Sequence, residues 1–130
     1  MNVVDSCGWL EYFGDGPNAD LFAEAIEATD SLVVPTLSLY EVFKRVLQQR
    51  GDGAALQAVA LMQQGRVLDL TTSVALAAAR ISLDEGIPMA DSVMLATARG
   101  NDATLWTQDA DFADIAEVRY FVKRDAGAGG

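Results

Sequence analysis

Residues 86–112 read GIPMADSVMLATARGNDATLWTQDADF and carry the pattern that decides the fold. After Pro88, the nearly all-apolar residues 90–98 predict a buried helix that ends at Gly100. A short apolar run at residues 103–106 predicts a strand almost directly after that helix. A buried helix followed by a short buried strand is typical of a parallel sheet that helices cover.

The same alternation extends over the rest of the chain. We expect further strands at residues 3–4, 31–34, 67–70 and 119–122. We expect further helices at residues 10–13, after Asn18 as N-cap, from Thr36 or Ser38, at 54–64, and from Thr72 or Ser73 to 85. The pattern predicts an α/β fold with a short, doubly wound parallel sheet and helices on both faces. Residues 1–125 would form a single domain, and residues 126–130 a flexible Gly/Ala tail.

The composition is that of a globular domain. The chain has 130 residues, of which 51% are hydrophobic and 22% charged. No apolar run approaches the length of a membrane-spanning helix, and the N-terminus lacks the pattern of a secretory signal. Its single cysteine, Cys7, excludes an internal disulfide and a cysteine-built zinc site. We therefore expect a cytoplasmic protein without a membrane partner.

The chain has no histidine and a net charge of −10. The absence of histidine excludes Ser-His-Asp and Cys-His catalysis and every zinc site that needs an imidazole. An enzyme of this sequence must use carboxylates, hydroxyls, Lys and Arg, or a hard metal ion held by oxygen atoms. The negative net charge, taken alone, argues against nucleic-acid binding, because neutralisation of phosphates supplies most of that affinity.

Three acidic residues occupy positions where a site is expected. Asp5 follows the first predicted strand and Asp109 follows the fourth, and sites of open α/β sheets form outside the carboxyl ends of the strands. Both residues also suit a helix cap or a turn. Asp91 shares a helix face with apolar residues, where a carboxylate needs a cation, a cap or a metal. It also suits the first turn of a helix, where the dipole favours an acid.

The periodicity gives no functional role to Glu41. This residue lies opposite the apolar stripe of its predicted helix, four residues before Arg45. An ion pair between Glu41 and Arg45 on a solvated helix face would explain both residues. Residue patterns alone therefore indicate three candidate site acids and one surface acid.

Four segments together resemble the PIN domain family, the nuclease fold of VapC-type toxins. The resemblance covers residues 2–122 in the family's order and spacing. It rests on VVDSCGWLEYF at 3–13, SLYEVFKRVL at 38–47, GIPMADSVMLATAR at 86–99 and LWTQDADF at 105–112.

The resemblance implies a shared acidic site for a divalent cation. The matching catalytic positions are Asp5, Glu41, Asp91 and Asp109. Asp5, Asp91 and Asp109 would ligate Mg²⁺, with Mn²⁺ as a possible substitute, and Glu41 would be a further ligand or would orient the attacking water. The supporting candidates are Ser6, Thr107, which matches the family's hydroxyl position, and Asp111, an alternative or companion to Asp109.

Basic and aromatic residues offer candidates for RNA contacts. Lys44 and Arg45, one turn after Glu41, are the first candidates for phosphate contacts, and Arg99 is the next. Solvated ion pairs would explain these three cations equally well. The aromatic residues of 9–13 could stack on bases, although core or dimer contacts are the commoner use. Cys7 is expected to be a small buried hydrophobe.

The resemblance implies a metal-dependent endoribonuclease, the toxin of a toxin–antitoxin pair. Family substrates are structured RNAs such as tRNA or rRNA, or mRNA. The resemblance also implies a homodimer and an antitoxin whose C-terminal segment lies across the acidic groove. Two other hypotheses stay open: a PIN nuclease of RNA maturation without an antitoxin, and a non-cutting PIN-like module that binds RNA or a partner.

Overall fold

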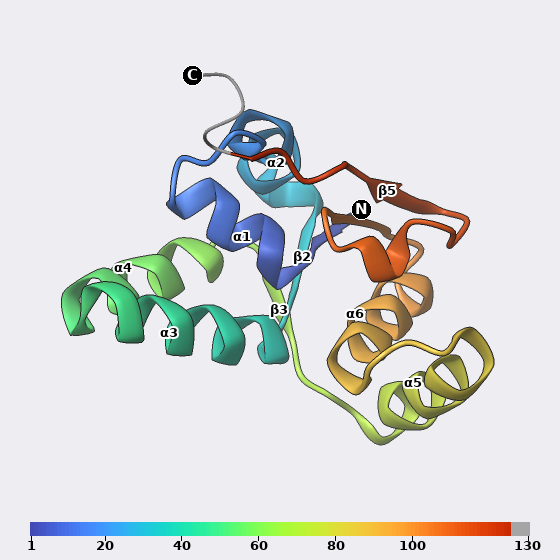
Figure 1. Cartoon of the computed structure of the whole chain (residues 1–130). Helices are drawn as coiled ribbons and strands as arrows, with labels where there is room; N and C mark the ends of the chain where they lie inside the picture. Colours follow the sequence, from blue (N-terminus) through green and yellow to red (C-terminus); the bar gives the residue numbers. More distant parts are fainter. Residues whose placement is uncertain (126–130) are drawn as a thin grey trace.

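A five-stranded parallel sheet forms the centre of the molecule (Figure 1). The computed structural model describes residues 1–125, so the predicted tail at 126–130 lies outside the described residues. The strands lie in the order β3-β2-β1-β4-β5. Their bounds are β1 Asn2–Val4, β2 Leu32–Pro35, β3 Arg66–Leu68, β4 Thr104–Thr107 and β5 Val118–Tyr120. The sheet and the helices around it confirm the predicted α/β fold.

Helices cover both faces of the sheet. The α-helices are α1 Ser6–Phe13, α2 Ala19–Glu27, α3 Thr36–Arg50, α4 Asp52–Met62, α5 Thr72–Glu85 and α6 Met89–Gly100, and two short 3-10 helices are η1 Thr29–Ser31 and η2 Ala110–Phe112. Helices α1 to α4 lie on one side of the sheet, and α5 and α6 lie on the other (Figure 1). Within residues 1–125, no helix combines the length and the apolar character that a bilayer span requires.

Side chains that alternate in direction along the strands contribute to two hydrophobic clusters, one on each face of the sheet. Val4 and Trp106 pack into the cluster formed with α1 to α4, whereas Val3 and Leu105 pack into the cluster formed with α6. Successive strand side chains point to opposite faces, so β1 and β4 each contribute to both clusters. Burial on both faces explains why these strands read as continuous apolar runs rather than as alternating ones.

The element boundaries differ from the sequence predictions at a few ends. Helix α1 begins at Ser6 rather than at residue 10, because Asp5 serves as its N-cap. Thr71, not Thr72 or Ser73, caps α5 by accepting a hydrogen bond from the Val74 amide. Strands β3 and β5 each begin one residue before their predicted starts. These shifts of one to a few residues leave the order of elements unchanged.

Asn18 precedes α2 as predicted, but its side chain does not cap that helix. Its amide nitrogen donates instead to Gln108 Oε1 at 2.9 Å and to the Val122 carbonyl at 3.1 Å. Asn18 Oδ1 accepts from Arg124 Nε at 2.5 Å. The buried Asn18 side chain thus connects the start of α2 to the segment after β4 and to residues 122–124.

The sheet has its topological switch point between β1 and β4. From β1 the chain proceeds outward to β2 and β3 on one side, while β4 and β5 fill the other side. Val4 pairs with Trp106, and the Asp5 amide donates to the Trp106 carbonyl at 2.9 Å. The carboxyl ends of β1 and β4 therefore lie next to each other, at the place where open α/β sheets form their sites.

Gly8 is required by close packing of α1 on the sheet. A Cβ atom at this position would lie 2.7 Å from the Phe22 ring and from Val4 Cγ1. We expect Gly8→Ala to lower the free energy of unfolding by about 1–3 kcal/mol through overpacking, measured by chemical denaturation. Gly53→Ala, in α4 with open space around it, is the matched control and should raise stability by about 0.5–1 kcal/mol. Equal stability of the two variants would contradict this account of Gly8.

Candidate active site

Three carboxylates converge at the switch point. Asp5 follows β1, Asp91 lies in the first turn of α6, and Asp109 lies two residues after β4. One carboxylate oxygen from each residue lies within 4.8 Å of the others. The structure therefore brings together the three acids that the sequence analysis placed at strand ends and on the apolar helix.

Asp5 is held in place by hydrogen bonds to both of its carboxylate oxygens. Oδ1 accepts from the Ser6 amide at 2.9 Å, and Oδ2 accepts from Thr107 Oγ1 at 2.9 Å and from the Cys7 thiol at 3.4 Å. The side chain is 5% exposed, and no cation lies among these partners. Asp5 is thus both the cap of α1 and a buried acid that lacks a compensating positive charge.

Burial and mutual repulsion raise the pKa values of two of the acids. Burial raises the pKa of Asp5 above its ordinary value despite its hydrogen bonds, and the charge of Glu41 adds to the shift. Partial burial raises the pKa of Asp91 to about 7, with further contributions from the charges of Asp5 and Asp109. Asp91 therefore carries a proton at neutral pH more readily than a solvated aspartate.

Thr107 connects the two strand-end acids. Its hydroxyl, which is fully buried, donates to Asp5 Oδ2 and accepts from the Asp109 amide at 3.0 Å. Asp109 Oδ1 in turn accepts from the Asp111 amide at 2.9 Å, which caps η2. The neighbouring Asp111 side chain also contributes to the raised pKa of Asp91. Asp111 thus lies at the exposed rim of the acidic cluster.

Glu41 lies beside the three carboxylates and is connected to them through Ser6. The Ser6 hydroxyl donates to Glu41 Oε1 at 2.7 Å, while the Ser6 amide donates to Asp5. The interpretation of Glu41 as a solvated acid paired with Arg45 is wrong, because Glu41 is half-buried and bonded to Ser6. Its helix, α3, starts directly after β2 and so directs Glu41 toward the same sheet edge.

The donor set fits a hard divalent cation. All candidate ligands are carboxylate oxygens, which Mg²⁺ prefers, and the cluster contains no nitrogen donor. A cation would relieve the repulsion that raises the Asp91 pKa and would supply the charge that buried Asp5 lacks. Mg²⁺ commonly uses one or two carboxylates with water and substrate phosphate as its other ligands, so three carboxylates suffice for one or two ions.

Cys7 is part of the site's surroundings rather than a simple core residue. It is half-buried, and its sulfur lies 3.4 Å from Asp5 Oδ2 and 3.3 Å from Thr107 Oγ1. Burial and the neighbouring Asp5 charge raise the pKa of the thiol to about 12, so it remains a neutral donor. No local sequence pattern indicates this contact, which the turn from β1 into α1 produces.

The aromatic residues after Cys7 have structural contacts. Trp9 is fully buried and stacks on Phe13 with ring centroids 5.8 Å apart. The Tyr12 hydroxyl donates to Glu27. Core packing therefore accounts for Trp9, while the half-buried Phe13 also lines a pocket.

The three basic candidates lie in different places. Lys44 is exposed and lies over the Tyr40 ring at 5.7 Å, and Arg45 is exposed on α3 beside a pocket that also contains Cys7. Arg99 lies at the far end of α6 from Asp91 and pairs with Glu117 at 3.9 Å, near the start of β4. The structure thus separates Arg99 from the acidic cluster, because α6 places Arg99 near the amino ends of the strands and the cluster lies at their carboxyl ends.

Removal of the Thr107 hydroxyl should loosen the acidic cluster. In Thr107→Val, the Asp109 amide and Asp5 Oδ2 each lose a partner, so we expect a loss of about 1–3 kcal/mol in the free energy of unfolding. Thr107→Ser keeps the hydroxyl and should restore most of the lost stability. Thermal and chemical denaturation of both variants would check this, and a Val variant as stable as the Ser variant would contradict it.

The fold and site together define an α/β protein with an acidic, oxygen-donor site at its switch point. The family model of the PIN domain matches residues 3–118, most of the chain. The chain belongs to the PIN domain family, which confirms the resemblance found in the sequence. No curated protein sequence matches it.

Several solved structures share this fold. A toxin–antitoxin complex from Klebsiella pneumoniae gives a TM-score of 0.77 at 18% identity, with 91% of this chain and 95% of that chain covered. Mycobacterium tuberculosis VapC20, a toxin that cleaves the sarcin–ricin loop, gives 0.76 at 16% identity, with 92% and 98% covered. DNA-bound VapBC from Salmonella typhimurium gives 0.71 at 14% identity, with 93% and 98% covered.

Proposed function

We propose that this chain is a divalent-metal-dependent endoribonuclease, the toxin of a type II toxin–antitoxin pair. The observation that carries the proposal is the convergence of Asp5, Asp91 and Asp109 within 4.8 Å at the switch point of a PIN fold. Mg²⁺ is the proposed cofactor, with Mn²⁺ as a substitute. The similarity in fold to VapC20 and to toxin–antitoxin complexes supports the choice of RNA as substrate and of a toxin role.

The four acidic residues take two roles in the proposed reaction, as cation ligands and as a group that orients water. Bound Mg²⁺ would polarise the scissile phosphate and lower the pKa of a coordinated water. Asp5, Asp91 and Asp109 would hold the cation, and Thr107 fixes the orientation of Asp5 relative to Asp109. Glu41 uses Oε1 for the Ser6 hydroxyl, which leaves Oε2 to accept a hydrogen bond from the attacking water. This division of labour needs no histidine.

The proposed partners are RNA, an antitoxin and a second copy of the chain. Toxin–antitoxin complexes among the similar structures support an antitoxin, whose C-terminal segment would cover the acidic site. Leu76 and Leu83 on α5 and Met89 at the start of α6 are 65%, 85% and 77% exposed. A set of exposed apolar side chains of this kind supports a homodimer contact. We place the protein in the cytoplasm, where its RNA substrates are found.

The decisive experiment is cleavage of a mixed tRNA and rRNA pool by the purified chain in Mg²⁺, Mn²⁺ or EDTA. Discrete cuts that require metal and disappear in Asp5→Asn/Asp91→Asn would support the nuclease. Equal cutting by both proteins would indicate contamination and contradict the site. Binding of RNA without cutting in either metal would favour a non-cutting PIN-like module, and cutting without toxicity or an antitoxin gene nearby would favour RNA maturation.

A further inference from the structure

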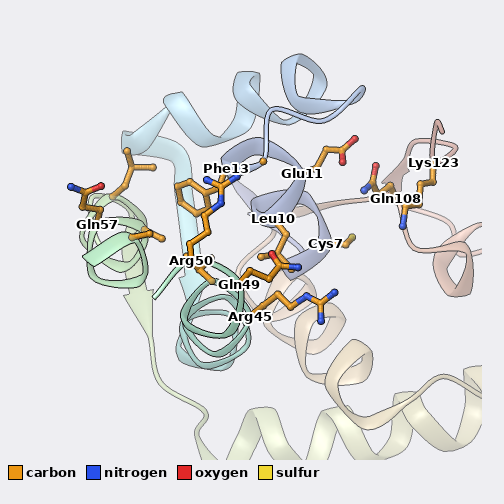
Figure 2. A pocket seen from close by; sticks show the side chains of 15 residues that line it. Cys7, Leu10, Glu11, Phe13, Arg45, Gln49, Arg50, Gln57, Gln108 and Lys123 are labelled. Atoms are coloured by element: carbon orange, nitrogen blue, oxygen red, sulfur yellow. The ribbon is translucent and has the colours of Figure 1, made fainter. Parts of the chain in front are cut away.

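A pocket of about 530 Å³ opens beside the acidic cluster, between α1, α3 and α4 (Figure 2). Its walls are apolar side chains from these helices, namely Leu10, Phe13, Val46, Ala54, Ala58 and Leu61. Three amide side chains also line it: Gln49 from α3, Gln57 from α4, and Gln108 from the segment after β4. The pocket thus combines an apolar interior with several amide groups.

The charge of this pocket is opposite to that of the whole chain. Arg45, Arg50 and Lys123 line it, three of the nine basic residues in a chain with 19 acidic ones. Among the described residues that line the pocket, Glu11 is the one acid. Its carboxylate accepts a hydrogen bond from the backbone N–H of Asn18 at 2.7 Å. Three cations against one carboxylate leave the pocket lining with a net positive charge, which favours an anionic ligand.

Two lining residues connect the pocket directly to the acidic cluster. Cys7 contacts Asp5 and Thr107 through its sulfur. Gln108 lies between Thr107 and Asp109 in the sequence, and Asn18 holds its side chain at 2.9 Å. If one phosphate of a polymer is bound at the acidic site, the neighbouring unit of that polymer can therefore reach this pocket.

We infer that this pocket binds the nucleotide next to the scissile phosphate of a single-stranded RNA segment. The inference rests on the proposed function and locates the substrate on the molecule. Arg45, Arg50 and Lys123 neutralise the flanking phosphates, which overcomes the repulsion from a chain of net charge −10. The apolar walls and the Phe13 edge accept the unstacked base, and the glutamine amides bind its hydrogen-bonding edge.

The test compares Arg45→Gln/Arg50→Gln with Arg66→Gln/Arg80→Gln. Both pairs change the net charge equally, and Arg66 and Arg80 are exposed residues outside the pocket lining. Binding of a short fluorescein-labelled RNA of mixed sequence is measured by anisotropy over a salt series, with Asp91→Asn present in every protein to prevent cutting. The pocket pair should reduce the slope of log affinity against log salt by about 1.4, at about 0.7 per lost phosphate contact. The control pair should leave the slope unchanged.

The outcomes separate this inference from the nuclease proposal. Equal slopes for the two pairs would overturn the pocket assignment, even if the wild-type chain cuts RNA. A reduced slope for the pocket pair would support the assignment, even if no metal produces cutting. A labelled peptide of alternating glutamate and leucine serves as a second, protein-like probe. If Arg45→Gln/Arg50→Gln keeps its RNA affinity but no longer binds this peptide, the pocket is a protein-binding groove and the RNA assignment is wrong.

Discussion

Mg²⁺ is expected to raise the melting temperature of the purified chain by roughly 10 °C when its concentration is about a hundredfold above its Kd. The physical reason is the convergence of Asp5, Asp91 and Asp109, which are destabilising when all are ionised without a cation. A ligand that binds only the folded state stabilises it by mass action. Thermal denaturation with Mg²⁺, with Mn²⁺ and with EDTA would measure the increment.

The same cluster gives the metal-free protein a defined pH dependence. The pKa of folded Asp91 is about 7, whereas its ordinary value is 3.8. Between these two values the folded state binds a proton that the unfolded state has released, so stability falls as the pH rises from about 4 to about 7. Cation binding requires the deprotonated acid, so the Mg²⁺ increment should grow over the upper part of this range.

Asp91→Asn serves as the control for both effects. The amide removes one charge from the cluster, so the metal-free variant should lose the part of the pH dependence that Asp91 causes. Its Mg²⁺ increment should also shrink, because one ligand is missing. An exposed acid such as Asp84 on α5, changed to Asn, should preserve the full increment. If Asp5→Asn, Asp91→Asn and Asp109→Asn all keep the full increment, the three acids do not share a metal.

Local patterns were sufficient for the fold and for three of the acids. Asp5 and Asp109 follow short apolar strands, and a parallel sheet brings the ends of β1 and β4 together. Asp91 was recognisable because an acid on an apolar helix face requires a partner. Their structural roles proved compatible with a site: Asp5 and Asp109 use one oxygen as a cap, and Asp91 occupies a first helical turn.

Contacts between distant segments could not be predicted from these patterns. Helical periodicity assigned Glu41 to a solvated face, because it contains no information about Ser6, which lies 35 residues away and bonds to it. The family resemblance predicts Glu41 in the acidic site, because the family's motifs come from segments that lie together in the fold. Arg99 is the next candidate for phosphate contacts after Lys44 and Arg45, but α6 places it at the other end of the helix from Asp91. The pocket cations Arg50 and Lys123 lie 73 residues apart and form no local motif.

Substitution of single acids is expected to divide the site into ligands and a positioning group. Asp5→Asn and Asp91→Asn should each reduce metal-dependent RNA cleavage by roughly 100- to 1,000-fold, because each removes charge that holds the cation. Glu41→Gln should reduce it by about 10- to 100-fold, since Glu41 lies outside the three-carboxylate cluster and contacts it through Ser6. The rates are measured under single-turnover conditions over a Mg²⁺ series.

The Mg²⁺ dependence, more than the size of the loss, distinguishes these roles. A ligand variant needs a higher Mg²⁺ concentration for half-maximal cleavage, whereas a variant that only misplaces the water keeps that concentration and loses maximal rate. Circular dichroism should show the native fold in all three variants, because Asn and Gln preserve the side-chain shape at Asp5, Asp91 and Glu41. A Glu41→Gln variant whose Mg²⁺ requirement rises as much as that of Asp91→Asn would make Glu41 a fourth ligand. The division between three ligands and one water-positioning acid would then be wrong.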